Sequence, residues 1–161
     1  MRMAFARPTE TALGRFSRLL PAYQSLELIV LKGHLMIEEQ LDRALVICAK
    51  HPHLLQDARL TFGQKVAVAH ALGVLPASLD MWRFITALNT LRNRLSHRLE
   101  PGDVASEIDR IIAAYWQDEF VPPTTARRRA TILRQALVML VAMLHGFNEV
   151  SDELKNLGPK A

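Results

Sequence analysis

The spacing of its apolar residues limits what this chain can fold into, because it follows the period of an α-helix almost throughout. Between 22 and 50, leucine, isoleucine and valine recur at three- and four-residue intervals, and charged residues occupy the opposite face. No Asn-Gly or Asp-Gly turn separates alternating segments, so hairpins are not expected. Prolines and glycines divide the pattern, and the predicted helices cover about 9–20, 22–50, 61–72, 76–99, 103–120 and 124–157.

These segments predict an all-α fold, an up-down helical bundle of about five helices in a single domain covering 1–161. The two long segments would each span roughly 45 Å, and shorter helices between them favour a bundle. Its core covers about 22–157, after a short N-terminal helix at about 9–20. Half of the residues are hydrophobic and 22% are charged, which is typical of a folded domain. The last helix is apolar over its middle, so part of its surface is a candidate dimer face.

Charge and cysteine content narrow the function classes only a little. A net charge of +4 is compatible with an anionic partner such as RNA, although many proteins without such a partner carry a similar charge. Cys48 is the only cysteine, which excludes an internal disulfide and a cysteine-based zinc site. No secretory signal and no run of about 18 uncharged apolar residues is present, so we expect a cytoplasmic protein without membrane contact. No metal or cofactor is predicted.

The stretch LRNRLSH, residues 91–97, places basic, amide and hydroxyl groups together at the end of a predicted helix. Asn93 and His97 are four residues apart and share a face, and the long side chain of Arg92 can reach the same ligand. Histidine moves protons near neutral pH, and arginine holds a phosphate through two hydrogen bonds. These groups suit cleavage of RNA, which carries its own nucleophile in the 2′-OH. The alternative is that the cations only complement the dipole at a helix C-terminus.

Arg92, four further residues and His97, with Asn93 directly after the arginine, resemble the Arg-x(4–6)-His motif of HEPN domains. HEPN domains are all-α bundles with two long, roughly antiparallel helices, and many are metal-independent endoribonucleases. The resemblance implies that His97 is the general acid–base, that Arg92 holds the scissile phosphate and that Asn93 supports this geometry. It further implies an RNA substrate, a homodimer with both motifs in one cleft, and products with a 2′,3′-cyclic phosphate and a 5′-OH.

The resemblance leaves two biological roles open. Several HEPN proteins are toxins of toxin–antitoxin pairs whose antitoxin partner is nucleotidyltransferase-like. Others are non-catalytic regulators, including proteins resembling the mannitol operon repressor. Outside the motif, the candidate RNA contacts are Arg94, Arg98, Arg127 and Arg128. The last two lie at a helix start, where the dipole disfavours cations, which suggests anion binding; the alternative is a solvated face.

A histidine and a glutamate in the first long helix form a second polar pair. His34 and Glu38 are one turn apart, but no second pair stands at matching spacing, so we interpret His34 as a core residue rather than a metal ligand. Glu38 is a candidate to lie across the bundle from Arg92 and orient it. His51 and His53 flank a proline and are expected in a solvated loop.

Overall fold

The computed structural model describes residues 12–20, 25–76, 80–97, 103–116 and 123–157, and every regular element in these ranges is an α-helix. This confirms the predicted all-α class. The described ranges hold seven helices, against the six predicted helical segments and the predicted bundle of about five, and α3 lies in a segment that was predicted as a loop. The helices are α1 (Ala12–Leu19), α2 (Leu26–Cys48), α3 (His53–Ala58), α4 (Phe62–Ala71), α5 (Met81–His97), α6 (Val104–Trp116) and α7 (Ala126–Leu157).

Short polar side chains cap several helix starts, as the sequence indicates. The Asp103 carboxylate accepts a hydrogen bond from the Ser106 backbone N–H at the start of α6 (3.0 Å), and Thr125 Oγ1 accepts from the Arg128 N–H at the start of α7 (3.2 Å). Thr61 forms a reciprocal capping box at the start of α4. These contacts satisfy N–H groups that have no partner within their own helix, so they fix where each helix begins.

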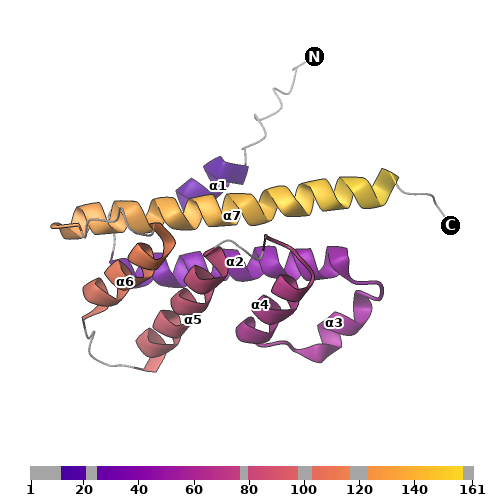
Figure 1. The fold of residues 1–161 in the computed structure, drawn as a ribbon, viewed down its shortest axis with the longest axis horizontal. Helices are drawn as coiled ribbons and strands as arrows, with labels where there is room; N and C mark the ends of the chain where they lie inside the picture. Colours follow the sequence, from indigo (N-terminus) through magenta and orange to yellow (C-terminus); the bar gives the residue numbers. More distant parts are fainter. Residues whose placement is uncertain (1–11, 21–24, 77–79, 98–102, 117–122, 158–161) are drawn as a thin grey trace, which may run out of the picture.

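The two long helices, α2 and α7, pack side by side and run in the same direction (Figure 1). Their contacts advance together along both chains, from Gly33 with Leu137, through Gln40 with Asn148, to Ile47 with Lys155. This parallel pairing departs from the antiparallel long helices that the HEPN resemblance implies. Its physical cause is that the helices between them return the chain to the end of the molecule where α2 begins.

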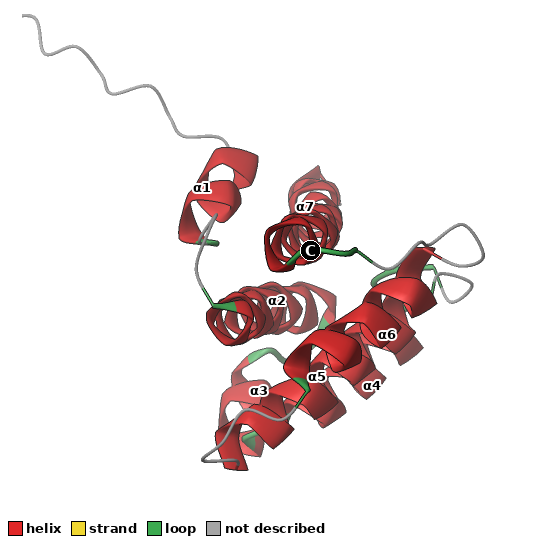
Figure 2. Ribbon diagram, turned by 90° about the vertical axis from the view of Figure 1, so that its left-hand side faces the viewer, coloured by secondary structure: helices red, strands yellow, loops and turns green. Residues whose placement is uncertain are grey.

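The shorter helices cover the long pair from two sides. Figure 2 shows α1 on one side of α2 and α7, and α4, α5 and α6 on the other. Two carbonyl oxygens at the C-terminus of α1, those of Ser17 and Leu20, accept hydrogen bonds from the Arg134 guanidinium of α7 (2.5 and 3.1 Å). On the opposite side the Arg129 guanidinium binds both oxygens of Asp109 in α6 (2.7 and 2.8 Å). Arginines of α7 therefore attach a helix on each side.

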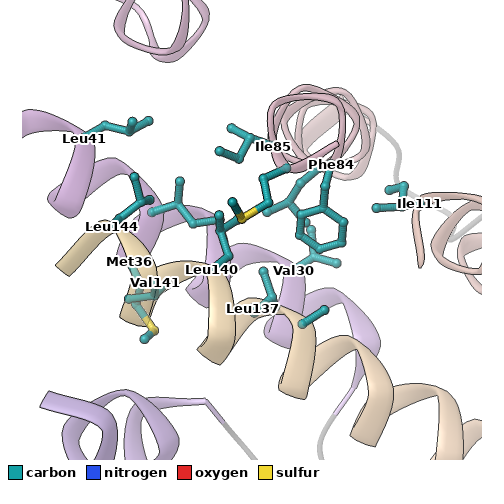
Figure 3. Close-up of a cluster of buried hydrophobic side chains, with 14 of the residues drawn as sticks. Val30, Met36, Leu41, Phe84, Ile85, Ile111, Leu137, Leu140, Val141 and Leu144 are labelled. Carbon is teal, nitrogen blue, oxygen red and sulfur yellow. The ribbon is translucent and has the colours of Figure 1, made fainter. Parts of the chain in front are cut away.

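The core lies where α2, α5 and α7 meet, and Figure 3 shows part of it. Its side chains come from segments far apart in the sequence, among them Val30, Ile85 and Leu140. Helix α7 has the length and apolar composition of a membrane span, but the core helix of a soluble protein passes the same test, and much of its apolar side is buried against α2. Composition alone therefore does not place α7 in a membrane.

Candidate functional site

Helix α5 carries the candidate residues, and its apolar side fixes the direction in which they point. The buried side chains of this helix are Met81, Trp82, Phe84, Ile85, Leu88 and Leu91. Beyond them, Arg92 and Leu95 are half-buried, while Asn93, Ser96 and His97 are exposed. The last turn of α5 therefore presents a polar surface, as the position of the leucines predicts.

The structure brings Arg92 and Asn93 into direct contact. The Arg92 guanidinium donates a hydrogen bond to the Asn93 side-chain oxygen (3.2 Å), and Ser96 Oγ donates to the Arg92 carbonyl one turn earlier (3.0 Å). His97 is exposed in the last turn and makes no hydrogen bond or ion pair with any residue that the structure describes. Its imidazole is thus available to a ligand, and Arg92 retains donors that can face a phosphate.

Behind Arg92 lies a buried histidine that contacts α5 through an amide. His34 is 3% exposed; its Nε2 lies 3.1 Å from the Asn89 side-chain oxygen, and its ring stacks on Phe62 (centroids 4.0 Å apart). Burial lowers the pKa of His34, with smaller opposing effects from Asn89 and Glu38. The neutral ring can donate from Nε2 to the Asn89 oxygen, which supports the helix face one turn before Asn93.

Sequence reasoning identified His34 as a core residue, which is confirmed, but it missed Asn89 and Phe62 as its partners. The four-residue spacing between Asn89 and Asn93 was the only local signal that both amides share one face. The contact with His34 joins residues 55 positions apart, and no periodicity encodes such a pairing.

The suggestion that Glu38 orients Arg92 is not what the structure shows. The Lys65 ammonium of α4 bonds to Glu38 and to Asp42, each at 2.8 Å. Burial disfavours the charge on Lys65, but the two carboxylate hydrogen bonds outweigh burial and raise its pKa. Glu38 therefore joins α2 to α4. Lysine, with three donors on one ammonium, satisfies both carboxylates at once.

The additional candidate cations lie in two different parts of the molecule. Arg94 bonds to Glu107 of α6 (3.0 Å) across a groove of about 250 Å³ that Arg110 also lines. Arg127 and Arg128 are exposed in the first turn of α7. Helix α6 packs between α5 and α7, so the structure does not bring Arg127 and Arg128 to the motif. Arg98 lies outside the described residues.

Within the described part of the chain, no three histidine, cysteine or carboxylate residues gather as metal ligands. His51 and His53 are exposed, although His53 begins α3 instead of lying in a loop. Cys48 is half-buried, and burial raises the pKa of its thiol, which disfavours the nucleophilic thiolate. Arg92, Asn93 and His97 therefore remain the group best suited to act on a ligand.

The arrangement consists of a half-buried arginine hydrogen-bonded to a neighbouring amide, with an exposed imidazole one turn further along the same helix. Comparisons with known protein families, with curated proteins and with solved structures gave no match for this chain. The HEPN resemblance accordingly rests on the Arg92-to-His97 motif and on the all-α fold, and the parallel direction of α2 and α7 stands against it.

Proposed function

We propose that the chain binds RNA and cleaves it without a metal ion, as a HEPN-like endoribonuclease with Arg92, Asn93 and His97 at its active site. The observation that carries the proposal is the Arg92–Asn93 hydrogen bond beside the exposed, unengaged His97. Arg92 would hold the scissile phosphate, and Asn93 would keep the guanidinium in place. His97 would transfer the protons.

The reaction follows from the chemistry of RNA. His97 takes the proton of a ribose 2′-OH, and the 2′-oxygen forms a bond to the adjacent phosphorus. The bond from phosphorus to the 5′-oxygen breaks, and that oxygen takes a proton from the imidazolium. The products are a 2′,3′-cyclic phosphate and a 5′-OH. Arg92 stabilises the negative charge that develops on the phosphate oxygens during this exchange.

The test is cleavage of a labelled single-stranded RNA in the presence of EDTA, with the product ends identified by mass spectrometry. His97→Ala and Arg92→Ala should each lower the rate by about a hundredfold or more, because a general acid–base or a charge-stabilising group is removed. His53→Ala is the matched control, since His53 is also exposed but lies in α3. Circular dichroism should be the same for all four proteins.

Equal degradation by wild type, His97→Ala and Arg92→Ala would trace the activity to a contaminant and reject the proposal. Growth arrest on expression, relieved by His97→Ala, would support the toxin role. An antitoxin of nucleotidyltransferase type would then be the partner to seek by co-purification with the wild-type chain.

A second candidate is a non-catalytic regulator that uses the same surface to bind a partner. The exposed last turn of α5 supports it, because Asn93, Ser96 and His97 can contact a partner there without any catalytic step. This candidate predicts RNA or protein binding that Arg92→Ala weakens, without any product ending in a cyclic phosphate.

A further inference from the structure

The face of α7 that points away from α2 is apolar over its middle. Met139, Met143 and Val150 are 48%, 39% and 57% exposed. Residues of this face follow the helical period, so they form one stripe along the outside of the molecule. In chain order its central positions are Gln135, Met139, Ala142, Gly146 and Val150.

A groove of about 620 Å³ lies along this stripe, between α1 and α7. Ser17 of α1 forms one side, and Val138, Ala142 and Met143 contribute apolar surface from α7. Arg134 also lines the groove, but its guanidinium is engaged by the carbonyls at the end of α1. An apolar groove that runs along a helix fits a second helix better than it fits a polar ligand.

Opposite charges stand at the two ends of the same stripe. Arg128 lies at the N-terminal end and Glu153 at the C-terminal end, and both side chains are exposed. Neither side chain forms an ion pair with a residue that the structure describes. The neighbouring carboxylates form ion pairs within the same chain, since Arg43 of α2 binds Glu149 (2.6 Å) and lies 4.0 Å from Asp152. Glu153 is therefore the carboxylate of this segment that remains for an external partner.

We propose that a second copy of this chain docks on α7, with the two α7 helices antiparallel about a twofold axis between residues 140 and 141. In this register Arg128 of each copy faces Glu153 of the other, so the charges pair twice. The same register sets Gln135 opposite Gly146 and Met139 opposite Ala142. Each long side chain thereby meets a small one, which lets two helices interdigitate closely.

The register also spans a length suited to a stable pair. From Arg128 to Glu153 the helix extends about 38 Å, so two such faces form a continuous contact through their apolar middle. A Cβ added at Gly146 would meet no atom of its own copy within 4 Å, so the fold of one chain does not require a glycine there. In the proposed dimer, a glycine at this position leaves space for the side chain of the partner's Gln135.

This pairing goes beyond the proposed function and does not depend on it. Figure 1 shows that the last turn of α5 lies on the side of the molecule opposite α7, so the dimer leaves both motifs exposed and far apart. It differs from the motif-to-motif dimer that the HEPN resemblance implies. Each copy would then meet its own stretch of RNA.

Charge reversal tests the register. Sedimentation equilibrium without detergent should show a dimer for wild type and a dissociation constant raised about tenfold or more for Arg128→Glu and for Glu153→Arg. The double variant, R128E with E153R, restores both pairs in the opposite sense and should return to within about threefold of wild type. High salt should shrink the differences between the variants.

A larger side chain at Gly146, within the proposed interface, gives an independent test. Gly146→Gln should weaken the dimer about tenfold, because the added side chain would compete for the same space with Gln135 of the partner subunit. Gly63→Gln in α4 is the matched control, since a Cβ added there also meets nothing within 4 Å but lies away from α7. Circular dichroism should show both variants folded.

Three results would overturn the proposal. A wild-type chain that stays monomeric to about 100 µM would show that this face does not bind a second copy. A dimer insensitive to both reversals and to Gly146→Gln would place the interface elsewhere. A chain that is monodisperse only in detergent would assign the face to lipid. RNA cleavage by the Glu153→Arg monomer would still be intact, because Glu153 lies outside the candidate RNA contacts, so a failure here is distinguishable from a failure of the proposed function.

Discussion

Among single residues, His34 links the buried core to the candidate site. Its ring packs on Phe62 and its Nε2 reaches Asn89, which shares a helix face with Arg92 and Asn93. Arg92 and Lys65 both disfavour a positive charge on His34, and Glu38 favours one, but burial has the largest effect. The charge state of one hidden residue is therefore coupled to the stability of the helix that carries the motif.

Stability should fall in mild acid because of His34. Its pKa in the folded chain is below its unfolded value of about 6.5, so the unfolded state binds a proton first as the pH falls. The contribution of the neutral ring is fully present above about pH 6.5 and is lost on acidification below it. The loss approaches about 1.4 kcal/mol for each unit by which the pKa is lowered.

Urea unfolding at several pH values between about 5 and 8 would measure this effect, with His34→Gln as the comparison. The variant starts less stable because it loses the stacked ring, but its free energy of unfolding should change less between these pH values. Parallel pH profiles for the two proteins would contradict the assignment to His34.

A second buried polar residue, Asn148, should stabilise the packing of α2 against α7. Its side-chain nitrogen donates to the backbone and side-chain oxygens of Gln40 (3.0 and 3.2 Å), and the residue is fully buried. Asn148→Ala removes both hydrogen bonds and leaves the buried side-chain oxygen of Gln40 without this donor, so it should lower the free energy of unfolding by about 1–3 kcal/mol. Asn156→Ala, an exposed asparagine of the same helix, should change it by less than about 0.5 kcal/mol. Equal effects would contradict this account.

At the scale of helices, α2 and α7 approach each other closely at a glycine of α2, Gly33. A Cβ on Gly33 would lie 2.6 Å from one methyl carbon of Leu137 and 2.8 Å from the other. Leu137 is fully buried, so it has no open space into which to move. The absence of a side chain at this position allows the two helices to pack along their whole shared length.

Gly33→Ala therefore sets two effects against each other. The crowding should cost about 1–3 kcal/mol, while the better helix preference of alanine returns about 1 kcal/mol. We expect a net loss of up to about 2 kcal/mol in chemical unfolding. Gly63→Ala, where the added carbon meets nothing, should instead be neutral or stabilise by about 0.5 kcal/mol. A higher free energy of unfolding for both variants would show that the Leu137 side chain can move away from the added Cβ without destabilising the protein.

Periodicity predicted most helices because each buries an apolar stripe that local sequence records. The caps at Asp103 and Thr125 are local chemistry as well, since each joins residues three apart in the chain. The short helix α3 was missed, because six residues carry too little of a helical period to be distinguished from a loop. The motif was likewise readable because Arg92 and Asn93 are neighbours in the chain.

Long-range pairings were beyond the reach of the sequence. An apolar stripe does not record the direction of the helix that it will meet, so the parallel pairing of α2 and α7 could not be predicted. Direction is decided by particular matches, such as Gly33 with Leu137 and Gln40 with Asn148. The prediction that Glu38 orients Arg92 was wrong for the same reason, because Lys65 approaches Glu38 only through the packing of α4 on α2.

At the scale of the whole molecule, α1 is an attachment to the bundle rather than part of its centre. Phe16 is buried and meets the His145 ring edge to face, with centroids 5.7 Å apart. The Arg134 guanidinium donates hydrogen bonds to two carbonyl oxygens at the C-terminal end of α1. An exposed ion pair between Arg15 and Glu39 adds little, because solvent screens it.

Arg134→Ala should release α1 while the rest of the bundle stays folded. Hydrogen bonds from a charged donor contribute about 1.5–3 kcal/mol, so amide exchange in α1 should become about ten- to a hundredfold faster. Exchange in α2 and α5 should not change. Arg83→Ala, which removes a largely exposed guanidinium from α5, is the control. Faster exchange throughout the chain would show that α1 is required for the whole fold.

The parallel pairing of α2 and α7 also has a consequence for biosynthesis. Gln40 and Asn148 meet across 108 residues of sequence, so the ribosome delivers α2 long before its main partner. Until α7 emerges, the side of α2 that carries Ile37 and Leu41 has nothing to pack against from that helix. The nascent chain should therefore rely on chaperones that shield apolar segments, and it should complete its fold late in translation.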